Sequence, residues 1–138
     1  MHSKFLFILI LIFNVPTIIA DEVWNSNYGQ IVYAKDVGVT AYWTYKYNGE
    51  SGIIFIPGLA GILERRGNYE GYWAQNKSGT RCQYARPGID DEPTYYWGKF
   101  HIQFTDLNFP TRWTALWSYC EETPSSVWDG TPEYHKLK

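Results

Sequence analysis

The sequence has few of the residues on which most catalytic and metal sites depend. Among its 138 residues, three are histidine and two are cysteine, and only His101 and His135 remain as histidines after residue 20. The stretch 58–61 contains two glycines but lacks the lysine that a phosphate-binding loop requires. Because a catalytic site needs a nucleophile, a base and a group that orients them, we predict that the protein is not an enzyme. We expect no catalytic residues, no bound metal and no cofactor.

Strong charge of one sign and long apolar runs are equally scarce. The chain has 12 basic and 14 acidic residues, which gives a net charge of −2. No basic run stands out, and this argues against nucleic acid as the partner. After residue 20, no run approaches the roughly 20 apolar residues of a transmembrane helix. We therefore predict no nucleic-acid partner and no membrane span in the processed chain.

The first twenty residues have the pattern of a secretory signal peptide. Lys4 supplies the positive start, the nine residues 5–13 are all apolar, and Ala20 is a small residue at the end. An uncleaved membrane anchor is the alternative, but the apolar run is short for one. We expect cleavage after Ala20, a single domain over residues 21–138 with a polar tail from about residue 131, and a secreted or periplasmic location.

The only two cysteines, Cys82 and Cys120, are expected to form a disulfide. An exported chain meets an oxidising environment, where an even number of cysteines normally pairs. A reactive thiol or a metal pair is the alternative, although no histidine or further cysteine lies nearby at metal-ligand spacing. Asn76 begins an Asn-Lys-Ser triplet, which matters as a glycosylation site only in a eukaryotic secretory pathway.

Aromatic residues are what the sequence has in abundance, with seven Trp and twelve Tyr. Many of them occupy alternate positions, and alternate side chains share one face of a β-strand. Asn48-Gly49 is a strong signal for a type I′ hairpin turn. Residues 77–94 form a long polar loop, and residues 59–67 are compatible with a strand, a helical turn or a loop. The pattern predicts strands over 30–35, 39–47, 51–56, 68–75, 95–104 and 112–120, and a short element at 127–130.

No segment shows a sustained apolar stripe of period 3.6, so we expect few helices. Sequential strands joined by short turns favour a meander. Glycines inside strands suit the tight bending of a small barrel, and closure removes exposed strand edges. The predicted fold is therefore all-β, a single small antiparallel meander barrel of about six to eight strands. A two-sheet β-sandwich is the alternative.

The order of aromatic and glycine motifs resembles that of small secreted barrels of the avidin and lipocalin type. Trp24 lies near the start of the processed chain, and it lacks the preceding glycine of the lipocalin Gly-x-Trp motif. The resemblance covers most of residues 24–130 and implies ligand binding inside or at the mouth of a barrel. It implies no particular ligand. The motifs that carry it are Trp24, Tyr28-Gly29, Gly-x-Tyr-x-Gly-x-Trp over residues 67–73, Trp97-Gly98 and Trp128-x-Gly130.

Three aromatic residues are predicted to lie on the side of their strands opposite the main apolar face: Tyr42, Tyr72 and Trp97. Partly exposed Trp and Tyr are typical of recognition surfaces and of sites that stack on sugars or amines. We take these three as the first candidates for contact with a ligand or partner. The predicted function is a secreted, non-catalytic binding protein, either a carrier of a small molecule or a protein-binding module.

Two other functions stay open. A hydrolase would need a carboxylate and histidine site, for which Asp90, Asp91, Glu92 and His101 are the available residues. The carboxylates, however, lie in a polar loop, and His101 is expected to face solvent from a strand. A structural, envelope-associated protein is the other possibility. The pair Arg65-Arg66 is expected at the surface.

Overall fold

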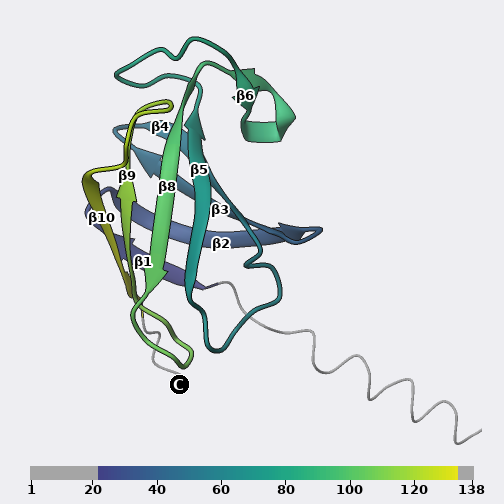
Figure 1. Ribbon diagram of the computed structural model, residues 1–138, viewed down its shortest axis with the longest axis vertical. Coiled ribbons are helices and arrows are strands. Elements are labelled where there is room, and N and C mark those ends of the chain that lie inside the picture. The colour runs from purple at the N-terminus through teal and green to yellow at the C-terminus, as the bar shows by residue number, and fades with distance from the viewer. Residues whose placement is uncertain (1–21, 134–138) are drawn as a thin grey trace, which may run out of the picture.

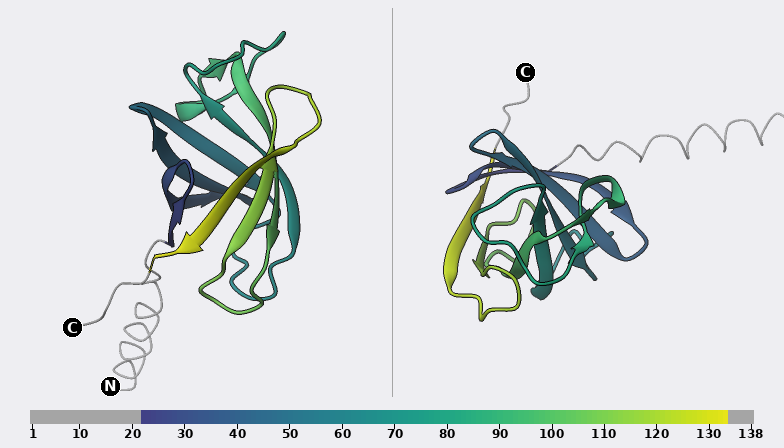
Figure 2. Two further views of the ribbon diagram at one scale, coloured as in Figure 1. Left: turned by 90° about the vertical axis from the view of Figure 1, so that its left-hand side faces the viewer. Right: turned by 90° about the horizontal axis from the view of Figure 1, so that it is seen from above.

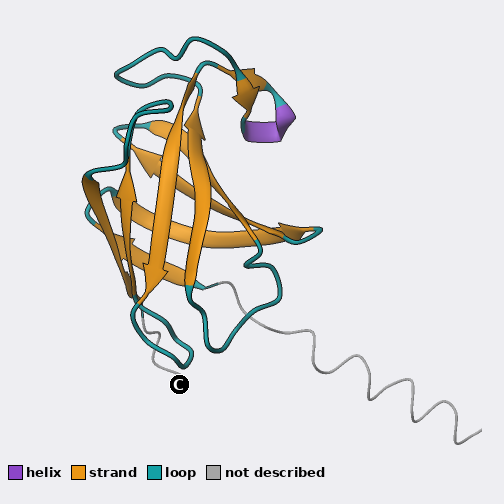
Figure 3. Ribbon diagram, viewed as in Figure 1, coloured by secondary structure: helices purple, strands orange, loops and turns teal. Residues whose placement is uncertain are grey.

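The computed structural model describes residues 22–133. The predicted signal peptide and its cleavage point lie outside the described residues, as does the tail beyond residue 133. Within them, eight strands close into an antiparallel barrel, with one short 3₁₀ helix, η2 (Ile89–Asp91), outside it (Figures 1 and 3). The barrel strands are β1 (Val23–Ser26), β2 (Gly29–Val37), β3 (Thr40–Tyr47), β4 (Glu50–Pro57), β5 (Asn68–Gln75), β8 (Tyr96–Phe104), β9 (Trp113–Trp117) and β10 (Ser126–Pro132).

Each barrel strand pairs with its neighbour along the chain, and β1 pairs with β10 to close the ring. The only interruption lies between β5 and β8, where the short strands β6 (Arg86–Pro87) and β7 (Pro93–Thr94) pair with each other instead. This arrangement confirms the predicted all-β meander barrel rather than the alternative sandwich. Four connections gather at one end of the barrel, which we call the open end: β1–β2, β3–β4, β5–β8 and β9–β10 (Figure 1). The opposite end is called the closed end.

The predicted strands match most of the observed ones. The prediction missed β1, which is only four residues long and pairs with β2 and β10, and the predicted loop over 77–94 contains β6, η2 and β7. The strand expected over 112–120 ends at Trp117, and Cys120 beyond it has a left-handed backbone with a φ of 55°. Residues 59–67, which the sequence left open, contain no strand or helix. The Asn48-Gly49 turn is confirmed, with φ values of 50° and 81°.

Aromatic rings fill the barrel from the closed end to about its middle. The centroids of Trp24 and Trp43 are 4.3 Å apart, and those of Trp43 and Trp113 are 5.5 Å apart. All three side chains are almost completely buried, as is Phe100 beside them. Trp43, Phe100 and Trp113 occupy inward-facing positions of predicted strands, and Trp24 joins them from β1. The interior here is a packed core and not a channel.

A buried ion pair seals the closed end. The guanidinium of Arg66 donates two hydrogen bonds to the carboxylate of Glu22, at 2.7 and 2.9 Å, and a third to Thr111 Oγ1 at 2.7 Å. Its Nε donates to the carbonyl of Ile62 at 2.7 Å. Arg66 is only 2% exposed, so the expectation that it lies at the surface is wrong. The carboxylate, the hydroxyl and the carbonyl together make burial of this cation possible.

Residues 76–95, which we call the overlying loop, fold back over the outside of the barrel at the open end (Figure 2). A disulfide between Cys82 and Cys120 fastens this loop to the segment that follows β9, which confirms the predicted bridge. Beneath the loop lies a second apolar cluster that we call the outer cluster. Its buried members are Ile53, Phe55, Ala74, Cys82 and Trp97.

Candidate functional site

A cavity of about 430 Å³ occupies the open end of the barrel, above the packed core. We call it the mouth cavity. Seven aromatic rings line it, together with a few polar side chains from the strand ends and the connecting turns. The rings are Tyr28, Tyr45, Tyr47, Trp73, Trp117, Tyr119 and Trp128.

Strand alternation explains why so many rings meet at this end. Tyr45 and Tyr47 continue the inward-facing positions of β3, above Trp43 in the core. Trp73 of β5 and Trp117 of β9 belong to the corresponding inward-facing rows of their strands. The same alternation that fills the core therefore brings rings to the mouth. Tyr45, Trp73 and Trp128 are buried there, whereas Tyr47 is 41% exposed and Trp117 is only partly buried.

A glycine makes room for one of these rings. The ring of Tyr45 lies directly against Gly52 on the neighbouring strand β4, and a Cβ atom there would overlap the ring. The Tyr45 hydroxyl donates a hydrogen bond to Gln75 Oε1 at 2.8 Å, and Gln75 Nε2 donates to the carbonyl of Lys77 at 2.7 Å. Burial raises the pKa of the Tyr45 hydroxyl far above its ordinary value, so the hydroxyl stays protonated and remains a donor.

Contacts between the rings hold the wall of the cavity in place. Tyr28 meets Tyr47, Trp117 and Trp128 in edge-to-face geometry, with centroid separations of 5.5, 5.8 and 5.1 Å. Trp128 Nε1 donates to Ser26 Oγ at 3.0 Å. Such pairs fix the orientation of each ring, so the cavity exists before any ligand enters.

Two buried polar atoms of the mouth cavity have no hydrogen-bond partner among the described residues, and a partly exposed carboxylate lies in the same lining. The indole Nε1 of Trp117 and the hydroxyl of Ser78 are both buried without a hydrogen bond. Glu50 is half-buried, and its carboxylate makes no hydrogen bond or ion pair within residues 22–133. Most buried polar groups in proteins are satisfied, so these two buried atoms are available to a ligand in the cavity. Trp43 Nε1, Trp113 Nε1 and Ser118 Oγ, which belong to residues outside the lining, lack partners as well.

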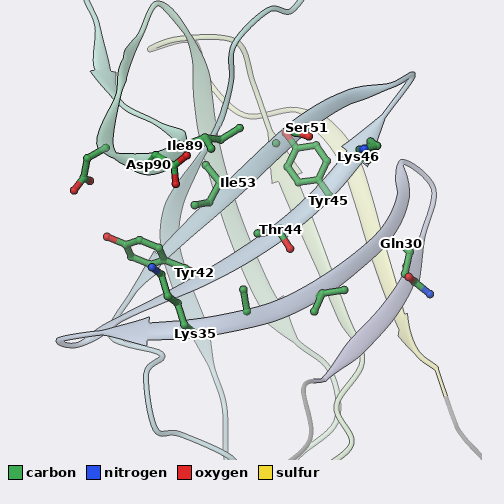
Figure 4. A pocket seen from close by; sticks show the side chains of 14 residues that line it. Gln30, Lys35, Tyr42, Thr44, Tyr45, Lys46, Ser51, Ile53, Ile89 and Asp90 are labelled. Carbon is green, nitrogen blue, oxygen red and sulfur yellow. The ribbon is translucent and has the colours of Figure 1, made fainter.

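A second concavity, the outer groove, lies on the outside of β2, β3 and β4 below the overlying loop, with a volume of about 910 Å³ (Figure 4). Lys35 and Tyr42 lie on one side of it, and Ile89 and Asp90 face them from the loop. The Nζ of Lys35 is 5.6 Å from the centre of the Tyr42 ring. Its lining mixes aliphatic, charged and hydroxyl-bearing side chains, and its only rings are those of Tyr42 and Tyr45, so it has fewer rings than the smaller mouth cavity.

The structure gathers the three predicted site residues, Tyr42, Tyr72 and Trp97, on the outside of the barrel. Phe55 connects the first two, with its ring centroid 4.8 Å from that of Tyr42 and 4.7 Å from that of Tyr72. Arg86 of the overlying loop lies 4.2 Å from the centre of the Tyr72 ring and 5.0 Å from that of Trp97.

The expected exposure of these rings is wrong for Trp97. Trp97 is 0% exposed, and its Nε1 donates to the carbonyl of Tyr84 at 2.9 Å. Tyr72 is half-buried, and its hydroxyl donates to the carbonyl of Pro87 at 2.9 Å. The overlying loop covers this face, so Trp97 is a structural anchor for the loop, and only Tyr42 borders a concavity.

Sequence reasoning missed the mouth rings as a site because it assigned them to the core. They share the inward face with the true core residues, and only their position near strand ends distinguishes them. Trp117 and Tyr119, for example, fall in the same alternating row as the core residue Trp113 within the predicted strand 112–120. They do contact the core, and they also line the cavity.

The residues proposed for a hydrolase are not brought together by hydrogen bonds or ion pairs in the described part of the chain. His101 faces outward from β8, opposite Glu70 of β5. Asp90 and Asp91 belong to η2 in the overlying loop. Among residues 22–133, no cluster of three or more His, Cys, Asp or Glu side chains is placed to hold a metal ion. In the same segment, no helix has the length and apolar character needed to cross a membrane.

Comparison with known proteins found no match to this chain, whether in a scan against protein-family models, in a search of curated proteins or in a search of solved structures.

Proposed function

We propose that this protein is a secreted, non-catalytic binding protein that holds a small, ring-bearing molecule in the mouth cavity. Ligand sites are typically concave, mostly apolar and equipped with a few polar groups, with volumes of roughly 300–1,000 Å³. The mouth cavity, at about 430 Å³, falls within that range. The Cys82–Cys120 disulfide is compatible with an exported protein.

The observation that carries this proposal is the convergence of seven rings on one open cavity. Rings buried against one another usually belong to a core, where they are covered on all sides. At the mouth, Tyr47 is 41% exposed and Trp117 is only partly buried, although both occupy inward-facing positions. A planar ligand stacked among them would remove apolar surface from water, which is the main source of affinity in such sites.

The packed core also limits how far a ligand can enter. Trp43 and Phe100 are completely buried, and their ring centroids are only 6.4 Å apart. A long lipid chain would need a deep barrel, so the ligand that fits is compact. Because the packed core blocks the deeper part of the barrel, a mouth site differs from that of a carrier that encloses its ligand along the barrel axis.

Two tyrosine variants test the location of the site. Tyr47→Ala removes an exposed ring from the mouth cavity, and Tyr42→Ala removes a ring of the same size from the outer groove. Ligand-observed NMR with a library of small ring compounds, both neutral and charged, identifies binders of the unaltered protein. We expect Tyr47→Ala to weaken the binders severalfold, since an aromatic contact contributes about 0.5–1.5 kcal/mol beyond its buried area. Tyr42→Ala should leave them unaffected.

The opposite result would contradict the proposal. If Tyr42→Ala abolishes binding and Tyr47→Ala does not, the outer groove is the site. If no compound binds the unaltered protein, the mouth cavity does not function as a small-molecule site.

A further inference from the structure

The geometry points to a cationic amine as the class of ligand held in the mouth cavity. This inference rests on the proposed function, because it names the chemistry of the same site. It goes beyond the proposed function by assigning a role to one carboxylate, that of Glu50, and to the faces of the surrounding rings.

Glu50 is an acidic residue in an unusual position. It is the first residue of β4, where Ile54 and Ile56 of the same alternating row point into the barrel core. Glu50 is therefore on the inward-facing row, opposite Tyr47 in the register of β3 and β4, and it lines the mouth cavity. Its carboxylate oxygens are not fully buried and make no hydrogen bond or ion pair within residues 22–133, so a cation in the cavity can reach them.

Only one positively charged residue, Lys77, shares the lining of the cavity with Glu50. The Nζ of Lys77 lies 5.3 Å from the centre of the Tyr96 ring, and Tyr96 is not part of the cavity lining. The Lys77 ammonium keeps its charge in that contact, and it makes no ion pair with Glu50. Glu50 is the one acidic residue in the lining, so a bound cation would find a carboxylate that no ammonium of the described residues already pairs with.

The rings provide the second part of an amine site. A cation is attracted to the electron-rich face of an aromatic ring, and Trp is the most effective of the three aromatic residues. Among the rings that line the cavity, Trp117 is only partly buried and Tyr47 is 41% exposed, so these two offer ring surface to a ligand, whereas Trp73 and Trp128 are almost completely buried. The unpartnered hydroxyl of Ser78 can accept a hydrogen bond from an N–H of a primary amine. A carboxylate at the rim and several rings in the wall are the combination that recognises ammonium groups.

The test compares a cation with a neutral molecule of the same shape. Choline has a charged nitrogen at the position where 3,3-dimethyl-1-butanol has a neutral carbon. Phenethylamine and 2-phenylethanol form a second pair, in which a terminal ammonium group takes the place of a hydroxyl. Binding is measured from the fluorescence of the tryptophans that line the cavity and, independently, by calorimetry. We expect each cation to bind roughly tenfold more tightly than its neutral counterpart, as a desolvated cation–π contact of 1–2 kcal/mol implies.

The variant Glu50→Gln keeps the shape of the side chain and removes its charge. It should reduce the preference for the cation severalfold and leave the affinity of the neutral molecule unchanged. Glu70→Gln is the matched control, because Glu70 is an exposed carboxylate on the outside of β5. It should leave the preference unaltered. Thermal unfolding of both variants verifies that the fold is intact.

The outcomes separate this inference from the proposed function. If the neutral molecules bind as tightly as the cations and Tyr47→Ala weakens both, the amine class is overturned and the mouth site stands. A preference that survives in Glu50→Gln also overturns the inference. If neither member of either pair binds, the ligand is not an amine, and the NMR library then decides whether the mouth cavity binds small molecules at all.

Discussion

Arg66 shows how one residue closes an end of this barrel. Its guanidinium contacts Glu22, Thr111 and the carbonyl of Ile62, and it lies 5.1 Å from the centre of the Phe104 ring. The backbone carbonyl of Thr111 also accepts a hydrogen bond from Trp24 Nε1, at 2.7 Å. The network connects the start of the described chain to two loops that are far apart in the sequence.

Replacement of Arg66 by Met is expected to destabilise the fold by about 3–5 kcal/mol, because the Glu22 carboxylate would remain buried without its cation. The neighbouring Arg65 is exposed, and Arg65→Met should change stability by about 0.5 kcal/mol or less. Denaturant unfolding of the two variants measures the difference. Equal losses of stability in the two variants would show that the Arg66–Glu22 ion pair stabilises the fold no more than the exposed Arg65 does.

The burial of individual residues was only partly predictable. Alternation placed Trp43, Trp73 and Trp113 on the inward face, because the period of two is a property of the strand itself. The same pattern could not predict that Trp97, on the outward face, would be covered. Its burial depends on the path of residues 76–95, and that path is held by a disulfide and by contacts across the sheet rather than by local periodicity.

At the scale of elements, the overlying loop is a second layer laid on part of the barrel. The disulfide joins it to the end of β9, and Tyr84 donates a hydrogen bond to Glu121 just beyond Cys120. This hydrogen bond lowers the pKa of the Glu121 carboxyl, and Lys99 nearby lowers it further. The covered face lies directly beside the connections that form the mouth.

Replacing both Cys82 and Cys120 by alanine is expected to lower the free energy of unfolding by roughly 3–4 kcal/mol in the chain-entropy model. The overlying loop should also become the first site of proteolysis, because its attachment to the outer cluster is weakened. Limited proteolysis and denaturant unfolding measure the two effects. A reductant should reproduce them in the unaltered protein and add nothing to the double variant. Cleavage elsewhere first would contradict this account of the loop.

At the scale of the whole molecule, the two ends of the barrel differ in their chemistry. The closed end contains a buried ion pair, whereas the open end contains a cavity that partly exposed rings such as Tyr47 line. The predicted meander and pairing order follow from turn signals and alternation, so the sequence was sufficient for them. The difference between the ends was not predictable, because it depends on which loops cross each opening.

Several buried tyrosines make the whole fold sensitive to alkaline conditions. Burial is the main cause that raises the pKa of Tyr45, Tyr33 and Tyr72, and a hydrogen bond to Asp36 adds to the effect at Tyr33. In the unfolded chain a tyrosine ionises near pH 10. Above that pH the native protein therefore retains more protons than the unfolded chain, and its stability decreases with rising pH.

We accordingly expect the free energy of unfolding to be insensitive to these groups below about pH 10. Above it, stability should fall by up to about 1.4 kcal/mol per pH unit for each such tyrosine. Denaturant titrations between pH 8 and pH 11 measure the slope. Tyr45→Phe removes one of the groups and should make the decline shallower than in the unaltered protein. An unchanged slope in Tyr45→Phe would mean that ionisation of Tyr45 is not coupled to unfolding.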